Sequence, residues 1–110
     1  MLNRISSISS IQCGNIFIDT KSYRVTLDGN EIHLFPKEYT ALCLFAQHPD
    51  WVFSKREIYE AVYDEETDID IDNIIFCLIH SLRKKIESDL KHPKYIKTIR
   101  GVGYKLIKNE

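Results

Sequence analysis

The chain has 110 residues, is 44% hydrophobic and carries a formal net charge of -1 at pH 7, so it fits one domain with a modest core and gives no overall electrostatic sign of a polyanionic partner. Cys13, Cys43 and Cys77 form an odd set without a Cys-x-x-Cys pair, which argues against a disulfide framework and favours reduced thiols in a cytoplasmic protein. No apolar run approaches the length of a membrane span.

The charges are unevenly distributed along the chain. Residues 57–72 contain eight acidic and no basic side chains, whereas residues 82–108 contain nine Lys or Arg and two acidic residues. A bipolar domain is therefore expected. Residues 1–12 are rich in serine and interrupted by Arg4, so they are interpreted as a flexible arm or linker remnant, with the folded domain at residues 13–110.

The first structured region alternates apolar and polar residues with a period of two, which is typical of strands. Three short strands are predicted, and their apolar positions are Ile16, Ile18, Tyr23, Val25, Leu27, Ile32 and Leu34. Residues 19–22 and 28–30 supply the turns, and the second turn contains Gly29, which tolerates positive φ. The predicted product is a small antiparallel sheet.

Two helices follow the predicted sheet. The first begins at Pro36, because proline suits a first helical turn, and it ends at His48-Pro49. Phe35 precedes Pro36, so this helix has no side-chain cap at that position. Ser54-Lys55-Arg56-Glu57 is a capping box that opens a second, short helix ending near Tyr63.

A third helix is predicted over residues 73–88. Its apolar stripe, spaced by four, three and four residues, is Ile75, Ile79, Leu82 and Ile86. Asp70 or Asp72 is expected to cap this helix at the end of an exposed acidic loop. The outward face, where a binding function would lie, comprises Asn73, Phe76, Cys77, His80, Ser81 and Lys84.

Two β-rich runs around Gly101-Val102-Gly103 predict a terminal hairpin over residues 95–107. The order is then an N-terminal antiparallel sheet, three helices and a C-terminal β-hairpin. A helix pair followed by a basic hairpin predicts an α+β winged helix-turn-helix, with the hairpin as the wing.

Five motifs make this expectation specific. They are Pro36-Lys37-Glu38-Tyr39, His48-Pro49, Ser54-Lys55-Arg56-Glu57, Leu82-Arg83-Lys84-Lys85 and Thr98-Ile99-Arg100-Gly101-Val102-Gly103-Tyr104. In this order and spacing the chain resembles the OmpR/PhoB-type winged-helix effector domain of bacterial response regulators, from about residue 14 to residue 107. The resemblance implies a four-stranded N-terminal sheet, with the extra strand expected at residues 31–35. The chain holds no receiver domain with a phosphoacceptor aspartate.

The resemblance implies sequence-specific binding of double-stranded DNA as the output of a two-component transcriptional regulator. The third helix is expected in the major groove and residues 99–104 in the minor groove. The expected DNA contacts are Asn73, Phe76, Cys77, His80, Ser81, Arg83, Lys84, Thr98, Arg100, Val102 and Tyr104. Arg83, Arg100 and Tyr104 are favoured among them, whereas Lys85, Lys91, Lys94 and Lys108 are interpreted as solvated surface.

One stretch departs from the family pattern. Ile74, Phe76 and Leu78 stand where the family places polar side chains toward the groove, and His80 and Ser81 replace the common paired arginines. Either these three apolar residues form an exposed patch that binds protein, which makes a winged-helix interaction module the alternative function, or some of them belong to the core.

The acidic loop has two interpretations. The resemblance implies a contact for RNA polymerase at Asp64, Glu65, Glu66, Asp68 and Asp70, and the alternative is a solvated loop. The spacing of the aspartates in this loop matches the start of an EF-hand calcium-binding loop. The glycine and the glutamate that such a loop requires are absent from the corresponding positions. No cofactor, metal site or enzymatic constellation is predicted. A homodimer on tandem half-sites is a further implication of the resemblance.

Overall fold

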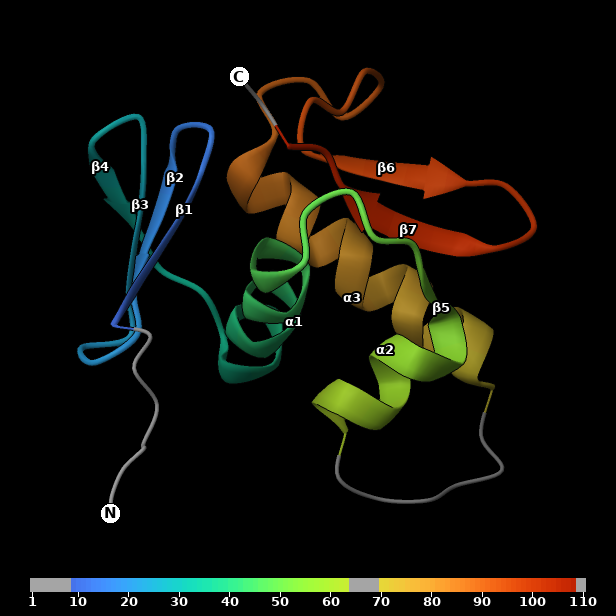
Figure 1. Cartoon of the computed structure of the whole chain (residues 1–110). Coiled ribbons are helices and arrows are strands. Elements are labelled where there is room, and N and C mark those ends of the chain that lie inside the picture. Colours follow the sequence, from blue (N-terminus) through green and yellow to red (C-terminus); the bar gives the residue numbers. More distant parts are fainter. Residues whose placement is uncertain (1–8, 64–69, 109–110) are drawn as a thin grey trace, which may run out of the picture.

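The computed structural model describes residues 9–63 and 70–108, which form three helices and two antiparallel sheets (Figure 1). The N-terminal sheet lies on one side of the helices and the C-terminal hairpin on another. The predicted fold class is confirmed, because sheet, helices and hairpin follow one another in the expected order. Within the described residues, no helix is long and apolar enough to cross a membrane.

The N-terminal sheet has four strands that pair antiparallel with their neighbours in chain order. They are β1 (Ser10–Cys13), β2 (Ile16–Asp19), β3 (Arg24–Leu27) and β4 (Asn30–Ile32). The additional strand was predicted at residues 31–35, and this is wrong: it is β1, which precedes the predicted strands. Three of its residues fall in the range assigned to a flexible arm, so the sheet begins before the predicted boundary; residues 1–8 lie outside the described part.

The turn between β3 and β4 matches its prediction. Asp28 and Gly29 both have positive φ, at 53° and 83°, which is the geometry of a primed hairpin turn. Asn30 then starts β4. The local turn chemistry therefore determined the pairing of these two strands.

The three helices are α1 (Pro36–Gln47), α2 (Lys55–Val62) and α3 (Ile71–Ile86). The capping box of α2 is confirmed in both directions: the Glu57 N–H donates to Ser54 Oγ over 3.1 Å, and the Ser54 N–H donates to Glu57 Oε1 over 2.8 Å. Asp70 caps α3 by accepting from the Asn73 N–H. This helix begins and ends two residues earlier than predicted. It packs against both other helices.

A second sheet, in the order β5–β7–β6, contains the predicted hairpin. Its strands are β6 (Ile96–Ile99), β7 (Gly103–Leu106) and a short strand, β5 (Phe53–Ser54), that the sequence pattern did not predict. Gly103 is required by this pairing, because a Cβ atom there would lie 1.9 Å from the Phe53 carbonyl oxygen. The hairpin is thereby joined to the start of α2.

Candidate nucleic-acid interface

The outer face of α3 is a row of exposed side chains along the helix. The exposed members are Asp72, Asn73, Phe76, Cys77, His80 and Lys84. The opposite face buries Ile75, Leu78, Ile79, Leu82 and Ile86. Five of the six outward residues predicted for this helix are therefore exposed, and the sixth, Ser81, is half-buried.

Of the two interpretations of Ile74, Phe76 and Leu78, the structure supports the second, in which some of them belong to the core. Leu78 is only 7% exposed and belongs to the core, and Ile74 is half-buried against it. Phe76 alone is exposed, at 60%. The stripe is wider than its spacing suggested, because α3 packs against α1 and α2 together.

Two aromatic rings lie side by side on the exposed face. Phe76 and His80, one turn apart, have ring centroids separated by 6.3 Å and planes inclined by 5°. Residues four apart on a helix are neighbours, and aromatic rings about 4.5–7 Å apart can interact. The two rings therefore form a flat surface at the centre of the exposed face.

Arg83, in the last turn of α3, connects the helix to the hairpin. Its Nη2 atom donates to the Ile96 carbonyl oxygen over 2.8 Å and to Thr98 Oγ1 over 2.9 Å. Its guanidinium carbon lies 5.6 Å from the centre of the Tyr104 ring, within cation–π range. Burial lowers the pKa of Arg83 from its usual value, and Tyr104 and Glu87 partly offset this effect. Arg83 thus fixes the wing relative to α3.

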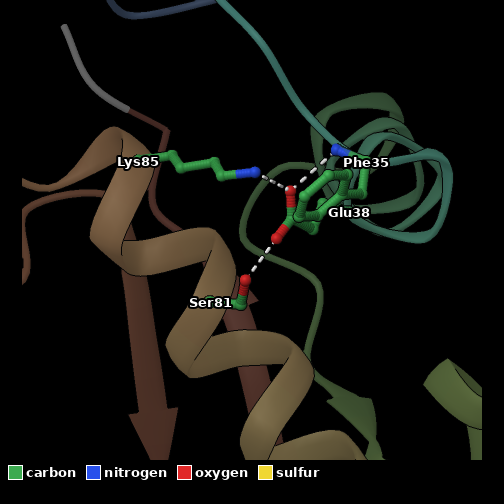
Figure 2. Close-up of polar contacts among 4 residues, drawn as sticks. All are labelled: Phe35, Glu38, Ser81 and Lys85. Carbon is green, nitrogen blue, oxygen red and sulfur yellow. Dashed lines mark hydrogen bonds and ion pairs between the residues drawn. The ribbon is translucent and has the colours of Figure 1, made fainter.

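Glu38 of α1 is a buried carboxylate, 2% exposed, that binds the middle and end of α3 (Figure 2). Lys85 Nζ donates to its Oε1 over 2.6 Å, the Phe35 N–H donates to the same atom over 2.8 Å, and the Ser81 hydroxyl donates to Oε2. Burial by itself raises the pKa of Glu38, but the hydrogen bonds from Lys85, Ser81 and the Phe35 N–H outweigh it, so the pKa is lowered. The interpretation of Lys85 as solvated surface is wrong, because its ammonium is the charge partner of this buried acid.

The tip of the hairpin is exposed and turns at Gly101, which has a φ of 78°. Arg100 and Val102 flank this glycine, and Val102 is 54% exposed. A groove of about 340 Å³ runs beside the tip, and its lining joins Lys55 of α2 and Asp72 of α3 to the hairpin. The wing tip and the start of α3 therefore border one continuous surface.

The comparisons with known proteins agree with this geometry. Residues 29–106, more than half of the chain, match the family model described as "Transcriptional regulatory protein, C terminal". The chain belongs to this family.

Individual members of this family and their solved structures are similar to the chain over most of its length. The chain is 43% identical over 96 residues to the uncharacterized transcriptional regulatory protein YcbL of Bacillus subtilis, which covers 87% of this chain and 42% of YcbL. The response regulator DrrB of Thermotoga maritima, an OmpR/PhoB homolog, aligns with a TM-score of 0.81 and 31% identity over 90% of this chain and 44% of DrrB. The DNA-binding domain of CpxR from E. coli aligns with a TM-score of 0.75 and 26% identity over 90% of this chain and 96% of that domain. The chain spans less than half the length of YcbL and DrrB.

The predicted contact residues of this regulator domain fall into three groups. Asn73, Phe76, Cys77, His80, Lys84, Thr98, Arg100 and Val102 are exposed, Ser81 and Arg83 are half-buried, and Tyr104 is buried. In the acidic loop, Asp64, Glu65, Glu66 and Asp68 lie outside the described residues. Asp70 is exposed and serves as the cap of α3.

Sequence reasoning missed two glutamates that position α3 in this family member. Glu38 was recognised only as part of a motif, although a glutamate two positions after Pro36 is a familiar partner for the N–H of the residue before the helix. Glu87, at the end of α3, accepts from the N–H groups of Lys94, Tyr95 and Ile96 over 2.6–3.1 Å. No periodic signal marks Glu87, because its donors lie seven to nine residues along the chain.

Proposed function

We propose that this chain is the DNA-binding output domain of a transcriptional regulator, with the exposed face of α3 in the major groove and the β6–β7 tip in an adjacent minor groove. The observation that carries the proposal is the fixed joint between these two elements. Arg83 bonds α3 to β6 through Ile96 and Thr98. Glu87, at the end of α3, accepts from the N–H groups of Ile96, the first residue of β6, and of Tyr95 just before it. The helix and the wing can therefore bind a duplex as one rigid unit.

The exposed side chains suit the two grooves in different ways. The major groove admits a helix and presents base edges in distinguishable patterns. Arg100 stands at the wing tip next to Gly101, where no Cβ atom obstructs close approach to a narrow minor groove. Lys84 and Lys97 are exposed and supply positive charge for phosphates.

The proposal extends to a regulator longer than the matched region. Because YcbL and DrrB are more than twice as long as the matched region, the proposal includes a separate part that receives the signal and is joined before this domain. Two copies are proposed to occupy tandem half-sites, and the segment between α2 and α3 is proposed to contact RNA polymerase. A regulator of this kind acts in the compartment that holds the DNA, the cytoplasm.

The test is a salt titration of duplex binding by the 110-residue chain. Neutralising Z phosphates gives a slope of about -0.9Z in log affinity against log salt. Replacing Arg100 with alanine is expected to weaken binding and to reduce the slope by about 1. Lys91→Ala, an exposed lysine in the connection between α3 and β6, is the matched control and should leave the slope unchanged. The absence of duplex binding at low salt by a folded chain would overturn the proposal.

A further inference from the structure

The exposed face of α3 has no free arginine with which to read guanine. The helix contains one arginine, Arg83, and its guanidinium is committed to Ile96 and Thr98. An arginine fork on guanine O6 and N7 is the commonest specific contact in the major groove. The usual guanine reader is therefore occupied within the fold.

The side chains that remain on this face point to a different base pattern. Asn73, in the first turn, carries an amide that can both donate to and accept from the adenine edge. Phe76 presents a ring that is 60% exposed, one turn further along, and His80 stacks beside it. In the major groove the apolar group of a base pair is the C5-methyl of thymine, which phenylalanine can contact.

We infer that α3 reads a half-site rich in A·T pairs, in which the Phe76 ring packs on a thymine C5-methyl and Asn73 contacts an adenine edge. The inference rests on the proposed DNA-binding function and names the bases recognised by the same surface. The His80 ring lies beside Phe76 with its plane nearly parallel, so the two rings together offer one flat surface to the methyl group.

Phe76 differs from the core residues of α3 in its exposure. Leu78 and Ile79 fill the buried side of the helix, so the exposed ring of Phe76 contributes little to the core. An aromatic ring in this position gains by losing contact with water, and a thymine methyl provides an apolar surface for it. The same ring cannot donate or accept the hydrogen bonds that a guanine edge requires.

The experiment begins with selection of binding sites from a random duplex library by the full chain. In the selected duplex, each thymine is then replaced singly by deoxyuridine, which removes the methyl group and keeps the base pairing. One such replacement is expected to weaken binding about fourfold, the effect of losing one buried methyl group. Phe76→Ala should bind the thymine and deoxyuridine duplexes equally well.

The control variant is Phe17→Ala, which removes another partly exposed phenylalanine from β2, in the N-terminal sheet. It should keep the deoxyuridine sensitivity of the parent chain. A guanine-dependent site that is insensitive to deoxyuridine, or a sensitivity that persists in Phe76→Ala, would overturn the inference while leaving DNA binding intact. Failure to select any duplex would overturn the proposed function and this inference with it.

Discussion

The two halves of α3 are held in different ways. The C-terminal half buries Leu82 and Ile86 and is tied to its surroundings by polar contacts as well: Ser81 and Lys85 bond to Glu38, and Arg83 bonds to the hairpin. The N-terminal half is held by its apolar side, where Ile75 and Leu78 are buried, and its exposed residues, such as Phe76, make few contacts with the rest of the fold.

The difference shows that charge in the sequence is a poor guide to free surface. Of the three basic residues in the last turn of α3, Arg83 and Lys85 are bound to other parts of the fold, and Lys84 alone is fully exposed. An apolar residue, Phe76, is more exposed than either of them. The proposed base-reading surface and the anchoring surface therefore lie on successive segments of one helix.

The largest effect is expected from removing the buried acid. Glu38→Leu leaves the Lys85 ammonium, the Ser81 hydroxyl and the Phe35 N–H without their acceptor, and should lower the free energy of unfolding by about 3 kcal/mol. Urea unfolding measures this change. Phe76→Ser in the exposed half is the matched control and should change stability by less than about 0.5 kcal/mol. A loss below about 1 kcal/mol for Glu38→Leu would mean that the cluster acts as an ordinary surface pair.

A smaller effect is expected at the joint between α3 and the hairpin. Arg83→Met keeps the apolar stem but removes the hydrogen bonds to Ile96 and Thr98, and should lower the free energy of unfolding by about 1.5 kcal/mol. Lys84→Met, at the exposed neighbouring position, is the control for the lost charge. Equal stability of the two variants would show that the joint contributes nothing beyond a surface charge.

The smallest change in stability is expected when the pH is lowered, because a protonated Glu38 still fills its site. The pKa of Glu38 is lowered in the folded chain, so its charge contributes fully above the unfolded value, near 4.5, and this contribution is lost as the pH falls through the folded value. The stability difference between the parent chain and Glu38→Gln should therefore narrow on acidification from pH ~7 to pH ~3. Unfolding curves at several pH values measure this stability difference. A stability difference between the two proteins that stays constant or widens on acidification would contradict the lowered pKa of Glu38.

The sequence by itself determined the helices, the hairpin and the order of elements. The capping box at Ser54, the aspartate cap at Asp70 and the turn at Gly29 are local signals, since each is satisfied by atoms within a few residues. The order of a helix pair and a basic hairpin predicted the winged helix, and the family motifs made that prediction specific. Most of the outward residues of α3 were also correct, because helical period alone separates its two faces.

The tertiary structure alone decided which of the residues expected at the surface are buried or paired. Lys85 is paired because α1 lies against α3 and brings Glu38 to it. Leu78 is buried in the core, and Tyr104 is buried where the Arg83 guanidinium lies over its ring. The pairing of β5 with β7 requires Gly103, because a Cβ atom there would clash with the Phe53 carbonyl group. These contacts join residues up to about fifty positions apart in the sequence, so no local period or motif predicts them. The face of α3 proposed to bind DNA is the part of the helix that does not take part in this packing.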